Sequence, residues 1–115
     1  MPLLKDKYSE AVITSRMAST YSEAGILDSA ENYYRKALSL EPEIPNRMHN
    51  LAYFLIDKDR NINQGLELVD TALIKSPDNY NYLHTKGWGF YKQGKYNEAL
   101  EILQKSWDLR REKAI

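Results

Sequence analysis

The sequence of 115 residues contains no cysteine. This absence excludes disulfide bridges, thiolate metal ligands and a cysteine nucleophile, and it leaves the cellular compartment open. An excess of either charge is also missing, since 16 Lys and Arg side chains balance 16 Asp and Glu side chains. Because a chain without net charge has no overall attraction to nucleic acid or to an anionic membrane, we expect no nucleic-acid ligand.

Long apolar runs are absent as well. The N-terminal stretch MPLLKDKYSE is too short and too charged for a signal peptide or a membrane span, so we expect no direct membrane insertion. The localisation stays unknown: the chain is cytoplasmic, or periplasmic or envelope-associated if it is a fragment of a longer exported protein.

Motifs of catalysis and cofactor binding are missing too. The chain has no glycine-rich phosphate loop, no nucleophile elbow and no zinc-protease helix, so we expect no enzyme, no catalytic residue and no cofactor. The stretch from Asp57 to Asn63 begins like a calcium loop. However, Ile62 and Leu68 stand where such a loop needs a glycine and a glutamate. This stretch is therefore predicted to be a polar turn that binds no metal.

What the sequence does contain is an internal repeat. Three small residues, Ala30, Gly65 and Ala99, recur at a nearly constant interval, and Pro42 and Pro77 follow the first two at the same distance. The apolar spacing between these positions is helical throughout. A period of this length predicts an array of stacked helix pairs, in which no single unit can bury its own apolar face.

Glycine, polar turns and proline divide this pattern into six predicted helices. The helices pair as about 6–24 with 28–40, 45–57 with 62–75, and 80–92 with 96–112. We predict a single domain over residues 1–115, with repeats at about 11–44, 45–79 and 80–113. Further rows of small residues at equivalent places would let the helices of a pair approach closely: Ala18, Ala52 and Gly87, then Ala37, Ala72 and Ser106.

These patterns resemble the tetratricopeptide repeat (TPR) family. The family's alternation of large and small positions is followed by Leu83–Gly87–Phe90–Gly94–Tyr96–Ala99–Leu103 and by Tyr21–Gly25–Ala30–Tyr34–Ala37–Pro42. The middle unit fits if its turn holds one extra residue. Lys86 and Arg111 stand where the family has leucine and proline, so the last helix is expected to run on. The resemblance implies an all-α fold, a right-handed superhelical array of three antiparallel helix pairs (an α-solenoid).

A looser likeness concerns two segments that lie one repeat apart. Asn50-Leu51-Ala52-Tyr53 and Thr85-Lys86-Gly87-Trp88 are similar to paired segments in some bacterial, envelope-associated repeat proteins. This likeness is the reason for keeping the envelope among the expected locations.

In the TPR family the first helix of each pair lines a concave face. The resemblance places a ligand-binding groove on this face, formed by Asn46, His49, Tyr53, Asn81, His84, Trp88 and Tyr91. It also places Ser15, Ser19, Ser22, Ile56 and Lys92 in this groove. The implied function is a protein–protein interaction scaffold that binds a peptide or protein segment. The alternative for Tyr53 and Trp88 is internal packing.

The two histidines favour groove lining over a metal site, because zinc normally takes three or four protein ligands. They could make binding sensitive to pH near neutrality. The alternative to a groove is a structural or oligomerisation module. In that case the uncapped last helix, with Leu103, Trp107 and Ile115, would stack on a second copy as a homodimer or on further repeats.

Overall fold

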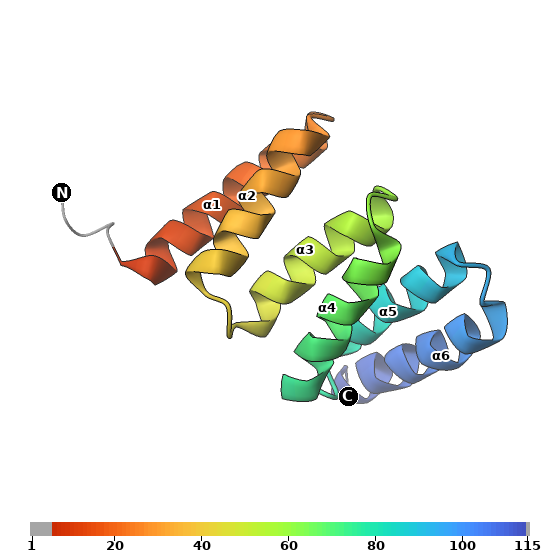
Figure 1. The fold of residues 1–115 in the computed structure, drawn as a ribbon. Helices are drawn as coiled ribbons and strands as arrows, with labels where there is room; N and C mark the ends of the chain where they lie inside the picture. The colour runs from red at the N-terminus through yellow and green to blue at the C-terminus, as the bar shows by residue number, and fades with distance from the viewer. Residues whose placement is uncertain (1–5, 115) are drawn as a thin grey trace.

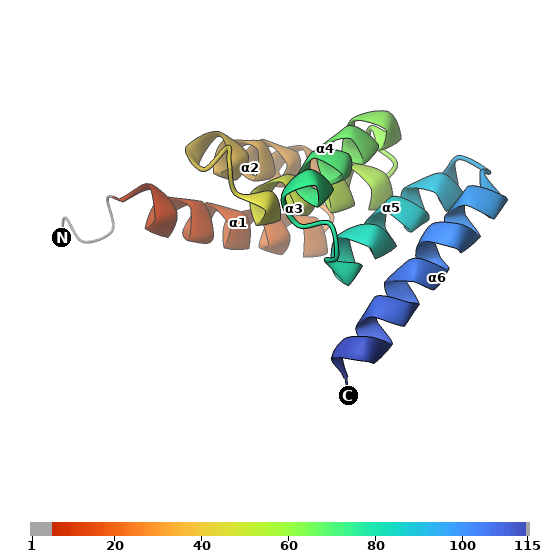
Figure 2. The same cartoon turned by 90° about the horizontal axis from the view of Figure 1, so that it is seen from below.

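The computed structural model describes residues 6–114, which form six α-helices and no strand (Figure 1). The helices are α1 (Lys7–Glu23), α2 (Leu27–Leu40), α3 (Pro45–Asp57), α4 (Ile62–Lys75), α5 (Tyr80–Lys92) and α6 (Tyr96–Lys113). They form three hairpin pairs in a row, and both views place α1 at one end and α6 at the other (Figure 1, Figure 2). The all-α array is confirmed, and α6 passes Arg111 as expected. No helix among the described residues is long and apolar enough to cross a membrane.

Side-chain caps begin three of the helices. The side chains of Asp6, Asn61 and Asn79 each accept a hydrogen bond from a backbone N–H in the first turn of the following helix. Such caps satisfy donors that have no partner within the helix. Pro45 begins α3, where its fixed φ suits a first turn and its missing N–H costs nothing.

The turns within the pairs explain the uneven repeat spacing. Residues 24–26 and 93–95 form the shorter turns, whereas 58–61 form a turn that is longer by one residue. Gly25 and Gly94 adopt positive φ angles of 79° and 78°, and Asp59 adopts 55° in the longer turn. Glycine takes this conformation without strain, and aspartate tolerates it better than most residues do. The extra residue predicted for the middle turn is thereby confirmed.

Small residues let the helices of each pair approach closely, as the repeat predicted. Ala30 is fully buried. An ideal Cβ placed on Gly65 would lie 2.6 Å from Cγ1 of Ile56, and one on Gly87 would lie 2.7 Å from Cδ2 of Leu103. At these two positions a larger side chain would have to push the helices apart.

Each pair also packs on the next through its second helix, α2 on α3 and α4 on α5. At the contact between α4 and α5, Lys86 occupies the position where the family has leucine. Its Nζ lies 2.8 Å from Oδ1 of Asp70 on α4 and 5.8 Å from the ring centre of Phe90. Lysine can replace leucine here because its aliphatic stem covers apolar surface while its charge is paired.

Candidate functional site

The first helices of the second and third pairs, α3 and α5, enclose a depression of ≈ 380 Å³. Its lining consists of amides, imidazoles, phenols and one hydroxyl, from Asn46, His49, Tyr53, Asn79, Asn81, Tyr82, His84 and Thr85. Five of the seven predicted groove residues are therefore brought together here. No Asp, Glu, Lys or Arg side chain lines the depression.

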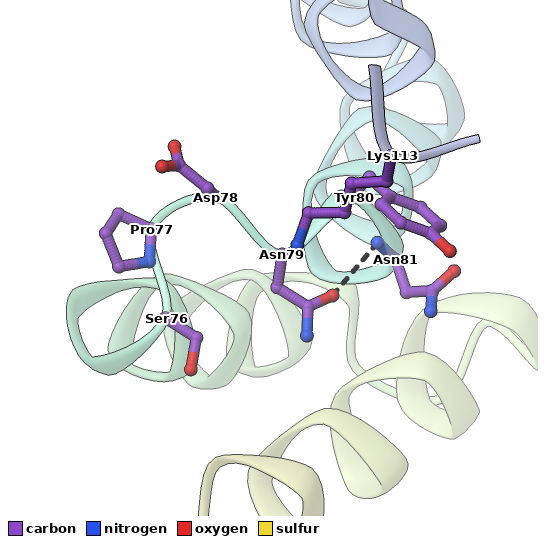
Figure 3. A pocket seen from close by; sticks show the side chains of 7 residues that line it. All are labelled: Ser76, Pro77, Asp78, Asn79, Tyr80, Asn81 and Lys113. Carbon is purple, nitrogen blue, oxygen red and sulfur yellow. Dashed lines mark hydrogen bonds between the residues drawn. The ribbon is translucent and has the colours of Figure 1, made fainter. Parts of the chain in front are cut away.

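A larger hollow of ≈ 550 Å³ lies at the turn between α4 and α5. It is lined by Ser76, Pro77, Asp78, Asn79, Tyr80, Asn81 and Lys113 (Figure 3). Lys113 reaches over it from the end of α6, and Oδ1 of Asn79 accepts a hydrogen bond from the backbone N–H of Asn81 at 3.0 Å. This hollow contains one of the predicted groove residues, Asn81, and is formed mainly by the turn that precedes α5.

Hydrogen bonds between α3 and α5 hold the walls of the α3–α5 depression in place. The Tyr82 hydroxyl donates to Oδ1 of Asn46 at 2.8 Å, and Nε2 of His49 lies 2.8 Å from Oγ1 of Thr85. The His49 ring also packs against the Tyr82 ring, with centroids 4.7 Å apart. Since these groups come from neighbouring repeats, the same contacts that join the repeats also fix the shape of the depression.

Burial changes the chemistry expected of His49. Desolvation lowers the pKa of His49 from 6.5 to about 4, so its imidazole is neutral at neutral pH. The expectation that this histidine would make binding pH-sensitive near neutrality is therefore wrong. The cause is its position against Tyr82 and beside the buried Thr85, a site where the charged imidazolium loses its hydration.

Trp88 and Tyr91 form a separate aromatic stack further along α5. Their ring centroids lie 5.3 Å apart with an angle of 8° between the planes, and Tyr91 is half exposed. Lys92 Nζ lies 5.3 Å from the Trp88 ring centre and donates to the backbone oxygen of Asp57 at 2.8 Å. The structure thus places these two aromatic residues beside the depression rather than among its lining residues.

Ile56, which was expected in the groove, lies elsewhere. Ile56 is fully buried and faces Gly65, in the interior of the second pair. Its expected place in the groove is wrong, because the absence of a side chain at Gly65 leaves room for an apolar side chain between α3 and α4.

Sequence reasoning missed three lining residues, Asn79, Tyr82 and Thr85. Asn79 precedes a helical run and follows Pro77, which is a recognisable N-cap signal. Tyr82 and Thr85 lie on one face of α5, because their spacing is that of neighbours on a helix surface. That spacing is the signal that could have found them.

A smaller depression of ≈ 200 Å³ separates α1 from α3. It is lined by Ser19, Ser22, Glu23, Tyr34, Tyr53, Phe54, Asp57 and Lys58. Two of the three serines expected in the groove therefore lie here, and Tyr53 lines both depressions. Burial raises the pKa of the Tyr34 phenol, so this hydroxyl remains protonated.

Within residues 6–114, no three His, Asp or Glu side chains gather closely enough to hold a metal ion. The polar groups of the α3–α5 depression are amides, phenols, imidazoles and one hydroxyl, with no Asp, Glu, Lys or Arg among them, and Tyr53 beside them is half exposed. Such a surface suits recognition of a polypeptide by hydrogen bonds and stacking.

Comparison with known proteins agrees with this architecture. Two family models, both described as tetratricopeptide repeat, match residues 15–44 and 81–114, together more than half of the chain. A TPR repeat-containing protein of Methanocaldococcus jannaschii is 35% identical over 89 residues, which are 77% of this chain and 16% of that protein. The chain thus spans a small part of the length of this relative.

Two solved structures have a similar fold. The TPR domain of Sgt2 from Aspergillus fumigatus superposes with a TM-score of 0.79 at 18% identity, over 88% of this chain and 66% of that one. A mutant of MamA superposes with a TM-score of 0.72 at 18% identity, over 90% of this chain and 79% of that one.

The repeat pattern, the three helix pairs and the sequence matches define a helical-repeat scaffold of the kind that mediates protein–protein interactions. The chain belongs to the tetratricopeptide repeat family.

Proposed function

We propose that this chain binds a segment of a protein partner in the depression between α3 and α5. The observation that carries the proposal is the hydrogen-bonding lining of that depression, which lacks Asp, Glu, Lys and Arg and contains five residues that the family resemblance had placed in the groove. A wall fixed by its own hydrogen bonds is preorganised, so less conformational entropy is lost on binding.

Two kinds of contact are available to a polypeptide there. Asn46 and Asn81 carry side-chain amides, which match the donors and acceptors of a peptide backbone. Oδ1 of Asn46 already accepts from Tyr82, so Asn46 offers its amide N–H groups. Tyr53 is 46% exposed and His84 is exposed, so their rings provide contact area for side chains of the partner.

Binding rather than catalysis is favoured by the environment of the one hydroxyl–imidazole pair in the depression. Thr85 and His49 lie within hydrogen-bond distance, as a nucleophile and its base would. However, Thr85 is only 2% exposed, and the ring of His49 packs on Tyr82 without a carboxylate to orient it. A substrate could not reach this hydroxyl, so the pair serves to join the repeats.

The test is selection of short peptides from a random displayed library against the immobilised chain, followed by affinity measurement for the selected peptide. Tyr53→Ala is expected to lower the affinity for that peptide about tenfold or more, because exposed aromatic residues commonly supply much of an interface's binding energy. His84→Ala is expected to weaken it too.

Ile74→Ala provides the matched control. Ile74 is the most exposed large apolar residue among those described, at 80%, and it lies on α4, outside the lining of the depression. The proposal is wrong if Ile74→Ala weakens the selected peptide while Tyr53→Ala and His84→Ala leave its affinity unchanged.

A further inference from the structure

The two ends of the array both expose apolar side chains. On α6, Leu100 is 66% exposed and Trp107 is 55% exposed. On α1, Ile13 is 46% exposed and Met17 is 38% exposed. Apolar side chains exposed together in this way commonly mark a surface that another protein segment covers.

The exposed residues of α6 repeat a surface that is already used inside the array. One repeat earlier in the chain, the places of Leu100 and Trp107 are taken by Leu66 and Leu73 on α4. Leu66 packs on α5, since an ideal Cβ on Gly89 would lie 2.7 Å from its Cδ2. Leu73 packs against the buried cluster that includes Tyr82 of α5. On α6 the same positions therefore present a surface shaped to receive another first helix.

The exposed residues of α1 repeat the opposite half of the same joint. One repeat later in the chain, the places of Ile13 and Met17 are taken by Arg47 and Leu51 on α3. Leu51 is buried in a cluster with Ala30 of α2, and Arg47 donates to Oε1 of Glu41, which directly follows α2. These α3 residues form the side that faces the preceding pair.

The α1 side is also hollowed. A depression of ≈ 510 Å³ is lined by Ile13, Arg16, Met17, Thr20 and Tyr21. Where the inner joint has the charged Arg47, this end has the apolar Ile13. A hollow surface at one end and an exposed tryptophan at the other thus stand at the positions that form the two sides of the inner joints.

We propose that copies of this chain stack head to tail, with Leu100 and Trp107 of one copy packed into the α1 hollow of the next. Such a contact joins two different surfaces and does not close on itself, so assembly continues beyond a dimer. This inference goes beyond peptide binding, since Leu100, Trp107 and the residues of the α1 hollow do not line the α3–α5 depression.

Head-to-tail stacking also differs from a homodimer formed through the last helix alone, which was one of the alternatives that the sequence left open. Of the three residues expected at that interface, Leu103 faces inward to Gly87, and Ile115 lies outside the described residues. Trp107 alone is exposed among them, and it needs the hollow of α1 as its complement.

The test measures mass by sedimentation equilibrium as the concentration of the whole chain rises. The mass of the wild-type chain is expected to rise from 13.4 kDa to beyond that of a dimer. Met17→Glu and Trp107→Glu each place a charge in one half of the joint, so each variant alone is expected to remain a monomer. Ile74→Glu is the control, because Ile74 lies on neither face, and it is expected to associate like the wild type.

An equimolar mixture of Met17→Glu and Trp107→Glu gives the decisive result. The first variant keeps an intact α6 surface and the second an intact α1 hollow, so the mixture is expected to form a pair of about twice the monomer mass and nothing larger. A symmetric α6 dimer would instead leave Met17→Glu dimeric and give no pairing in the mixture.

A wild-type chain that stays monomeric at every concentration overturns the proposal, and so does a mixture that fails to pair. Circular dichroism checks that each variant keeps its helices, and Ile13→Glu and Leu100→Glu replace any variant that does not. Peptide binding by the monomeric variants distinguishes this proposal from the groove proposal, because each can fail without the other.

Discussion

The joints that α3 makes on its two sides differ in how they are held. Toward α5, polar side chains connect the helices: Tyr82 to Asn46, Thr85 to His49, and Lys92 to the backbone of Asp57. Toward α1, no side-chain hydrogen bond or ion pair joins residues 7–23 to residues 45–57, and a depression of ≈ 200 Å³ lies between them. We call the hydrogen-bonded contact between α3 and α5 the interlocked joint, and the side of α3 that faces α1 the open side.

Side-chain length explains much of this difference. The α1 helix presents Ser15, Ser19 and Ser22 where the later first helices present larger side chains, five of six of them rings. A serine hydroxyl on a helix reaches its own backbone more readily than it reaches a neighbouring helix. The first pair is held instead through α2, where Arg60 Nε bonds Oε1 of Glu31 at 2.6 Å.

The two sides of α3 are therefore held to different degrees. Hydrogen bonds fix the α3–α5 depression that we propose as the binding site, whereas α1 makes few direct contacts with α3. Tyr53 lies at the boundary, because it lines the depressions on both sides.

The largest expected effect comes from removing packing at the centre of α3. Leu55 is fully buried, so Leu55→Ala should lower the free energy of unfolding by about 2–5 kcal/mol through lost burial and an unfilled cavity. Met17→Ala at the outer end of α1 should cost less than about 1 kcal/mol, since Met17 is already 38% exposed. Urea denaturation followed by circular dichroism measures both. Equal losses would mean that the two regions are packed alike.

The next effect is a pH dependence that belongs to the interlocked joint. Because burial lowers the pKa of His49 to about 4 from 6.5, the unfolded chain binds more protons than the folded chain between these pH values. Stability should therefore be full above about pH 6.5 and fall by up to about 3 kcal/mol as pH drops toward 4.

Urea denaturation across this pH range measures the loss. His49→Gln removes the titrating group and should abolish the loss of stability between about pH 6.5 and 4. His84→Gln keeps His49 and should therefore show the same loss as the wild type. If the stability of His49→Gln falls with pH as steeply as that of the wild type, another group causes the pH dependence.

The fold could be predicted closely because it rests on local signals. Helical spacing, Gly25 and Gly94 at turns, and the row containing Ala30 and Gly65 each act within one or two helices. These signals predict all six helices and the extra residue in the middle turn. The extent of the single domain, residues 1–115, stays a prediction.

The site could be predicted less completely because its geometry depends on contacts between repeats. No local pattern shows that Tyr82 bonds Asn46 or that Thr85 meets His49, since these partners are 36 residues apart. Ile56 was expected in the groove together with Tyr91, but Ile56 faces Gly65 and is buried, whereas Tyr91 is half exposed. The binding role of the seven groove residues also stays a prediction.

A smaller effect is expected from removing one hydrogen bond of the interlocked joint. Thr85→Val keeps the shape of the side chain but leaves Nε2 of His49 without its partner, so it should cost about 1–2 kcal/mol. Ser22→Ala on the open side should change stability by less than about 0.5 kcal/mol. Thermal denaturation of both variants measures the difference. A neutral Thr85→Val would show that the α3–α5 contact does not depend on this bond.

The smallest effect, and the one with the opposite sign, concerns a serine of α1 whose hydroxyl oxygen is buried. Oγ of Ser15 has no hydrogen-bond partner among the described residues, whereas Oγ of the buried Ser106 donates to the backbone oxygen of Tyr80 at 2.7 Å. Because an unsatisfied buried hydroxyl opposes folding, Ser15→Ala should be neutral or stabilising by up to about 1 kcal/mol. Ser106→Ala should instead destabilise by about 1 kcal/mol. Thermal denaturation compares the two, and a loss at Ser15 equal to that at Ser106 would show that α1 is held by a polar contact and that the open joint is tighter than its geometry indicates.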